Sequence, residues 1–96
     1  MTGFLLSPAA QADVDDIWNY TAQRWNIDQA ETYINALRDA CHDLAAGTRM
    51  SRPVDIREGY RKLLVGSHVL FFKSNEAGQI VIIRILHQRM DTQKHL

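Results

Sequence analysis

Apolar residues recur at helical spacing through the first half of the chain and gather into strand-like runs in the second. The first stretch predicts a helix from Pro8 to about Trp25, with Ser7 as its N-cap and a short strand at residues 3–6 before it. Its predicted apolar face repeats every three or four residues: Ala10, Val14, Ile17, Thr21 and Trp25.

A second helical period begins after a break at residues 26–27. Asp28 followed by Glu31 resembles a capping box, and Gly47 is a natural C-terminal stop. The predicted apolar face is Ala30, Ile34, Leu37, Cys41 and Leu44. Because the connection is only two or three residues long, the two helices are expected to form an antiparallel hairpin.

The second half reads as a loop at 48–58 followed by three β-rich segments, at about 60–65, 68–73 and 79–87. The turns Gly66-Ser67 and 75–78 separate them and predict an antiparallel three-strand meander. We therefore expect one α+β domain over residues 1–96. It has an N-terminal short strand and an antiparallel helical hairpin packed on a small antiparallel sheet.

Apolar side chains occupy both parities of the last two predicted strands, as in the pairs Leu70/Phe71 and Ile82/Ile83. Both faces of the sheet are then apolar, and one helical hairpin covers only one of them. The other face, or the groove beside it, is expected to need a partner. A second copy of the chain is one possibility, and a peptide-like partner is the other.

The net charge changes sign at the same place in the sequence where the predicted helices give way to predicted strands. Residues 1–48 carry two bases and seven acids, a net charge of −5, whereas residues 49–96 carry nine bases and four acids, a net charge of +5. The overall balance of zero argues against a dedicated nucleic-acid or ribosome binder. The lone Cys41 and the lack of a secretory signal or membrane span favour a reduced cytoplasmic setting.

Few residues suggest chemistry. There is no metal-ligand spacing, glycine-rich phosphate loop or G-x-S-x-G motif. Arg61, Arg84, His87 and Arg89 form the one candidate cluster, since Arg and His together can cleave a phosphodiester. The ordinary interpretation is that Arg84 pairs with a carboxylate across the sheet, Arg61 is solvated and His87 ends a strand.

The order and spacing of four motifs resemble the ParE toxins of the RelE/ParE superfamily over essentially the whole chain. The first two are L-S-P-A-A-x-x-D-x-x-x-I-W-x-Y from Leu6 and A-x-x-Y-I-x-x-L-x-x-A from Ala30. The others are E-G-Y-R-K-L-x-V-G-x-H-V-L-F-F from Glu58 and I-x-R-I-L-H-x-R-M-D from Ile82.

This resemblance implies the hairpin-on-sheet fold and the toxic half of a bacterial type II toxin–antitoxin pair. It implies a protein inhibitor, without cofactor or catalysis, that stabilises the cleaved-DNA complex of DNA gyrase. It also implies a ParD-like antitoxin that wraps over the toxin, in a hetero-oligomer that binds operator DNA through the antitoxin.

The RelE relatives are ribosome-dependent mRNA endonucleases, and here Arg61, Arg84 and His87 would carry that alternative. The neutral charge and the absence of Tyr after Tyr60 favour gyrase inhibition. A pure antitoxin-binding module is a third hypothesis.

The predicted target-binding residues lie on the sheet surface and C-terminal tail: Arg61, Arg84, His87, Arg89, Met90 and Lys94. The predicted antitoxin-binding residues combine half-buried aromatics with loop cations: Trp18, Tyr33, Arg49, Arg52 and Arg57. The three arginines would meet acidic residues of the antitoxin.

Overall fold

The first helix starts where the sequence predicts. In this computed structural model, which describes residues 3–90 and 92–96, β1 (Phe4–Leu6) leads directly into α1 (Pro8–Arg24). The Ser7 Oγ accepts a hydrogen bond from the Ala10 N–H at 3.0 Å and so caps α1. Trp25, predicted on the apolar face, is instead 67% exposed at the end of the helix.

The second helix, α2 (Ile27–Ala46), has its N-cap two residues before the predicted cap, Asp28. Its N-cap is Asn26, whose Oδ1 accepts the Gln29 N–H at 2.7 Å. Asp28 instead lies in the first turn, where its charge suits the helix dipole. Gly47 closes the helix with φ 75°, as its position predicts.

The sheet contains the expected meander: β3 (Arg61–Val65), β4 (His68–Ser74) and β5 (Ile80–His87) pair antiparallel in sequence order. Two strands extend it. At one edge β1 pairs parallel with β5, which makes the sheet mixed, and at the other a two-residue β2 (Arg52–Pro53) forms within the predicted loop. The sheet order is β1-β5-β4-β3-β2.

A β-bulge shifts the register of β5 against β4. Phe72 faces Ile82, but the next pair is Phe71 with Arg84, so Ile83 is the extra residue. Without the shift His68 would face Leu86; with it, His68 faces His87. The bulge therefore brings two histidines together at the end of the sheet.

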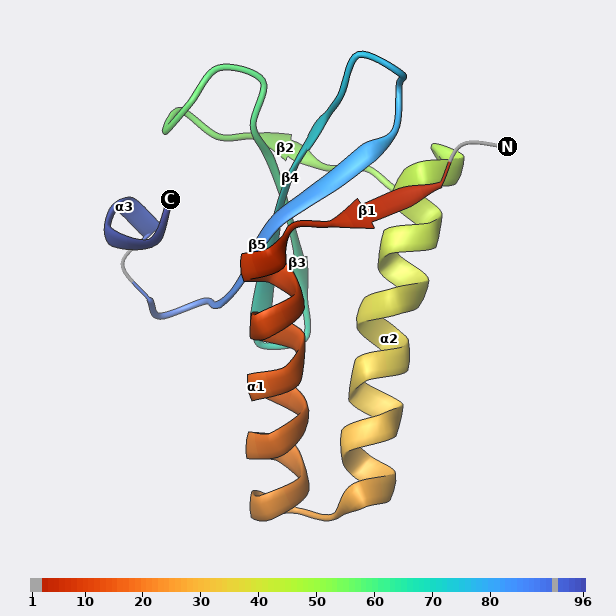
Figure 1. The fold of residues 1–96 in the computed structure, drawn as a ribbon, viewed down its shortest axis with the longest axis vertical. Helices are drawn as coiled ribbons and strands as arrows, with labels where there is room; N and C mark the ends of the chain where they lie inside the picture. The colour runs from red at the N-terminus through yellow and green to blue at the C-terminus, as the bar shows by residue number, and fades with distance from the viewer. Residues whose placement is uncertain (1–2, 91) are drawn as a thin grey trace.

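The long helices α1 and α2 cover one face of the sheet, and the short C-terminal helix α3 (Thr92–His95), absent from the sequence prediction, lies apart from them, to the left of β5 in Figure 1. The core between hairpin and sheet centres on Leu37, Cys41, Leu70 and Ile82. Burial raises the pKa of the Cys41 thiol to about 11, which agrees with its interpretation as a core residue and not a reactive thiol.

The second face of the sheet is less open than the sequence predicts. Phe71 and Leu86 alternate with the helix-facing residues, yet they are only 3% and 2% exposed. Leu64, on the same face of β3, is 55% exposed. The centre of this face is therefore covered by the chain itself, and exposed apolar surface remains at its edges, at Leu64 on β3 and at Leu5 on β1, which is 47% exposed. Of the two expected partner surfaces, the groove beside the sheet is left open and the centre of the face is not.

Candidate functional site

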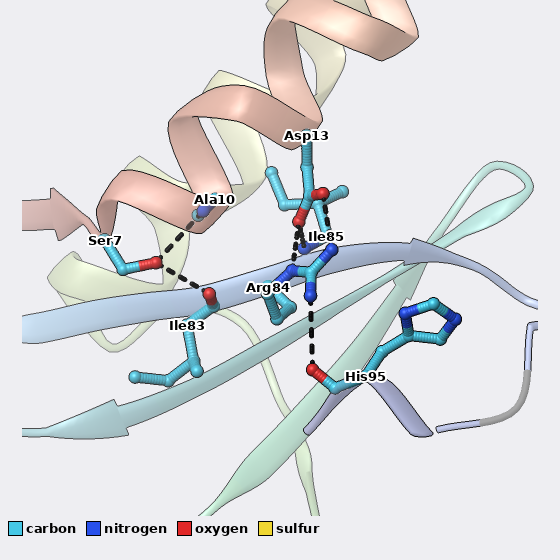
Figure 2. Close-up of polar contacts among 7 residues, drawn as sticks. All are labelled: Ser7, Ala10, Asp13, Ile83, Arg84, Ile85 and His95. Atoms are coloured by element: carbon cyan, nitrogen blue, oxygen red, sulfur yellow. Dashed lines mark hydrogen bonds and ion pairs between the residues drawn. The ribbon is translucent and has the colours of Figure 1, made fainter. Parts of the chain in front are cut away.

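Two hydrogen bonds from Ser7 fix the start of α1 to β5, and Figure 2 shows the one from its hydroxyl. The Ser7 N–H donates to the Ile82 carbonyl at 2.9 Å, and the Ser7 Oγ donates to the Ile83 carbonyl at 2.7 Å. Because β1 pairs with β5 only as far as Ile82, the next part of that edge is free for α1. Asp13, further along α1, accepts a hydrogen bond from this free edge of β5.

Asp13 binds both the side chain of Arg84 and the backbone of β5 (Figure 2). The Arg84 guanidinium donates to the two carboxylate oxygens at 2.8 and 2.9 Å, a bidentate pair. The Ile85 N–H donates to the Asp13 Oδ2 at 2.9 Å, which satisfies a strand-edge donor. The side chains of Arg84 and Asp13 are only 23% and 11% exposed.

The same guanidinium also holds the C-terminal segment. The Arg84 Nη1 donates to the His95 carbonyl at 3.2 Å, so Arg84 joins α1, β5 and α3 (Figure 2). Hydrogen bonding to Asp13 raises the pKa of Arg84 further above its usual range. The predicted carboxylate partner thus exists, but it comes from α1 and not from across the sheet.

Arg61 lies two strands away from this network. Its Nε and Nη2 donate to the hydroxyl and the carbonyl of Ser51 at 2.7 and 2.8 Å. In the sheet it pairs with Phe72, which in turn faces Ile82. Arg61 is exposed, as the ordinary interpretation expected, and the structure does not bring its guanidinium together with that of Arg84.

The remaining predicted target-binding residues follow the end of β5. The Nδ1 of the half-buried His87 accepts a hydrogen bond from the Arg89 N–H, with the two nitrogens 3.2 Å apart. Arg89 and Met90 are exposed, Met90 by 42%, and Lys94 is exposed on α3. His87, Arg89 and Met90 therefore lie within four consecutive residues, of which His87 is half-buried and the others are exposed.

Tyr33 and His68 form a polar contact that the sequence did not reveal. The Tyr33 hydroxyl lies 2.6 Å from the His68 Nδ1 and accepts the Ser67 N–H at 3.1 Å, so α2 holds the β3–β4 turn. The rings of His68 and His87 meet edge to face, with centroids 5.4 Å apart. Burial, and then repulsion from His87, lower the pKa of His68, while Asp13 acts in the opposite direction.

The three loop arginines lie near the opposite end of α2. Arg49 is 3.6 Å from Asp43, with both side chains more than a third exposed, so the pair is weak. Arg52 lies in β2, paired with Lys62, and Arg57 is exposed in the following loop. Trp18, by contrast, is half-buried on α1. The predicted antitoxin set is therefore divided between two regions.

A groove of about 510 Å³ runs beside β3, and all the residues that line it come from the basic half of the chain. Met50, 92% exposed, and Leu64, 55% exposed, line it together with Arg52 and Lys62. We call this the β3 groove. It combines apolar surface and positive charge, and within the described residues the outer edge of β3 has no strand partner at residues 63–65.

Within residues 3–90 and 92–96, no group of three or more His, Cys, Asp or Glu side chains is placed to hold a metal ion. Over the same residues, no helix combines the length and the apolar character needed to cross a membrane.

Comparison with known proteins identifies the class. The sequence model of the family described as "ParE toxin of type II toxin-antitoxin system, parDE" matches residues 4–92. Over 94 residues the chain is 50% identical to Toxin ParE1 of Mycobacterium tuberculosis, which covers 97% of this chain and 96% of that protein. Identity to Toxin ParE1 of Caulobacter vibrioides is 40% over 97 residues, covering 100% of this chain and 99% of that one.

The fold agrees with this class. A solved structure of the chromosomal ParDE toxin–antitoxin system from P. aeruginosa superposes with a TM-score of 0.78 at 21% identity, over 91% of this chain and 96% of the other. The chain belongs to the ParE toxin family of type II toxin–antitoxin systems.

Proposed function

We propose that this toxin acts in the cytoplasm by binding DNA gyrase and stabilising its cleaved-DNA complex, and that a ParD-like antitoxin neutralises it. The effect would be a population shift, because a ligand that binds the cleaved state more tightly than the other states enriches that state. Beyond family membership, one observation best supports a binding mechanism. The guanidinium of Arg84 is already bound by the Asp13 carboxylate.

Arg61 and Arg84 both make hydrogen bonds within the protein, and this counts against the endonuclease alternative. Cleavage of a phosphodiester needs a cation free to stabilise the charge that develops on the phosphate. Here the Arg84 guanidinium already binds a carboxylate and the His95 carbonyl, and Arg61 is held by Ser51. Only His87 of the three proposed nuclease residues is left without a strong partner among those that the structure describes.

We assign target binding to the accessible segment after β5, which contains His87, Arg89 and Met90, with Lys94 beside it on α3. We call this segment the target face. Arg84 supports it from behind by fixing α3 to β5, and Arg61 has no part in it.

We assign the β3 groove to an extended, acidic segment of the antitoxin. Such a segment can add a strand at the free edge of β3 while its apolar side chains cover Met50 and Leu64. Arg52 and Lys62 line the groove with positive charge, Arg49 precedes the groove residue Met50 in sequence, and Arg57 lines a separate hollow next to β2. The toxin–antitoxin complex would then bind operator DNA through the antitoxin.

The test is a supercoiling assay with purified gyrase, plasmid and ATP. Micromolar toxin should reduce supercoiling and increase linear, gyrase-linked DNA, and an equimolar antitoxin should prevent both effects. Unchanged supercoiling without cleaved DNA would rule the mechanism out. Translating ribosomes with labelled mRNA serve as the parallel assay, in which intact transcripts are expected.

A further inference from the structure

A second concave surface lies where the tip of the helical hairpin passes the end of the sheet. Its volume is about 310 Å³, and Tyr20, Arg24, Trp25, Tyr33, His68 and His87 are among the residues that line it. Figure 1 shows the α1–α2 connection extending beyond the β3–β4 turn. We call this surface the tip cleft.

The tip cleft is free of carboxylates although it lies in the acidic half of the chain. Residues 1–48 hold seven acids, yet no Asp or Glu lines the cleft. Arg24 is a permanent cation, and two histidines lie at the other side. The lining is therefore complementary to a single negative group.

Large aromatic side chains are exposed at the same place. Trp25 is 67% exposed and Tyr20 63%, and the neighbouring Ile27 is 57% exposed. Trp, Tyr and Arg are the residue types that most often dominate the energy of protein interfaces, because they bury a large area and keep a polar handle. Because these aromatic side chains lie beside the cation Arg24, they match a partner that carries an apolar group next to an anionic one.

A protein segment fits the cleft better than a nucleic acid does. A polyphosphate is held by several cations, whereas this cleft offers one permanent cation. The adjacent hollow shares His68 and His87 with the cleft, and it is lined by the exposed carboxylate Asp16, which repels phosphates; Asp13, which also lines it, is paired with Arg84. A protein segment with one carboxylate can place that charge at Arg24 and only apolar side chains near the hollow, so it avoids that repulsion.

We infer that the tip cleft docks a segment of the toxin's protein target that carries a carboxylate next to an apolar side chain. The inference rests on the proposed function, because the hollow that contains His87 and Met90 joins the target face to the cleft. The antitoxin groove lies elsewhere, beside β3. Trp25 is the apolar anchor and Arg24 binds the carboxylate.

The experiment compares Trp25→Ala and Arg24→Glu with two controls, Met50→Ala in the β3 groove and Lys73→Glu on an exposed part of β4. The readouts are the toxin concentration that gives half-maximal cleaved DNA with gyrase, growth arrest on expression, and affinity for the antitoxin. Trp25→Ala should raise the half-maximal concentration about 30-fold and Arg24→Glu about tenfold. Both should relieve growth arrest and keep antitoxin affinity, whereas Lys73→Glu should change nothing.

Met50→Ala should show the opposite pattern, with weaker antitoxin binding and unchanged poisoning. Retained antitoxin binding shows that the tip variants are folded. If wild-type toxin arrests growth without affecting gyrase, the proposed function fails, and relief of arrest by the tip variants still supports the docking site.

Four results would overturn the docking site: full growth arrest by both tip variants, an equal loss of antitoxin binding in them, binding of a single-stranded oligonucleotide that depends on Trp25, or self-association that depends on Trp25. A wild-type chain that arrests no growth would contradict both proposals.

Discussion

Asp13 has the largest structural role of any single polar residue described here. It lies one turn into α1, where sequence reasoning sees only a carboxylate that suits the helix dipole. In the fold it neutralises Arg84 and satisfies the Ile85 N–H at the free edge of β5. The sequence contains no local sign of this pairing, because the two residues are 71 positions apart.

Replacing Asp13 by Ala should therefore lower the free energy of unfolding by about 3 kcal/mol, because Arg84 would keep a poorly solvated charge without its partner. Asp16→Ala, an exposed carboxylate on the same helix, is the control and should cost less than about 0.5 kcal/mol. Urea unfolding measures both. Similar values for the two variants would show that the Asp13 network contributes little.

His68 makes stability depend on pH. Its folded-state pKa is lowered from the ordinary value of 6.5, mainly by burial, so the unfolded chain binds more protons as pH falls below that value. Its contribution is present above about pH 6.5. It is lost as the pH falls through the lowered folded-state pKa, below which both states are protonated.

Unfolding free energies measured between pH 5 and 8 should fall more steeply toward acid in the wild type than in His68→Gln. The amide oxygen of Gln can still accept a hydrogen bond from the Tyr33 hydroxyl but does not titrate. Parallel curves for the two proteins would contradict this assignment.

At the scale of elements, the β3–β4 turn depends on Gly66 for two separate reasons. Gly66 has φ 59°, in the left-handed region, and a Cβ placed there would lie 2.8 Å from the Tyr33 hydroxyl. Gly47, at the end of α2, shares the positive φ but has open space around it. The two glycines separate backbone strain from crowding.

Gly47→Ala should cost about 1 kcal/mol of unfolding free energy, because only the left-handed backbone is penalised. Gly66→Ala should cost about 1 kcal/mol more, since the new methyl group must displace the ring of Tyr33 and its contacts to the turn. Thermal unfolding of the two variants provides the comparison. An equal loss would mean that Tyr33 moves aside freely.

Elements were predicted well where periodicity determines them. Both helices, the three meander strands and both turns follow from local patterns, and the structure confirms them within a few residues. The parallel β1–β5 pair and the two-residue β2 were missed because such contacts are long-range or too short to leave a pattern. The bulge was also missed, although it alone places His87 opposite His68.

At the scale of the whole molecule, the fold presents two separate surfaces, and each combines a cationic side chain with exposed apolar side chains. The β3 groove runs beside β3 and reaches Val69 and Gln88, and the tip cleft lies at the tip of the helical hairpin, against His68 and His87. The sequence predicted a partner for uncovered β surface, and the chain itself covers the central part at Phe71 and Leu86. Only the fold could show this, because strand alternation does not reveal how the rest of the chain packs against a face.

Changing Arg49, Arg52 and Arg57 to Glu should slow antitoxin association about tenfold at low salt, because long-range attraction sets the on-rate. The salt dependence of that rate should weaken as well. Changing the same three residues to Lys keeps their charge and should leave the rate near that of the wild type. Stopped-flow mixing at several salt concentrations measures it, and an unaltered rate in the Glu variant would exclude an electrostatic contact.

The most direct test of the central claim, that this toxin acts by binding and not by cutting RNA, is to recover covalent gyrase–DNA complexes from cells arrested by it. The same cells are assayed for mRNA integrity. We predict that gyrase-linked DNA rises while transcripts stay intact. Fragmented transcripts with no increase in gyrase-linked DNA would contradict the account.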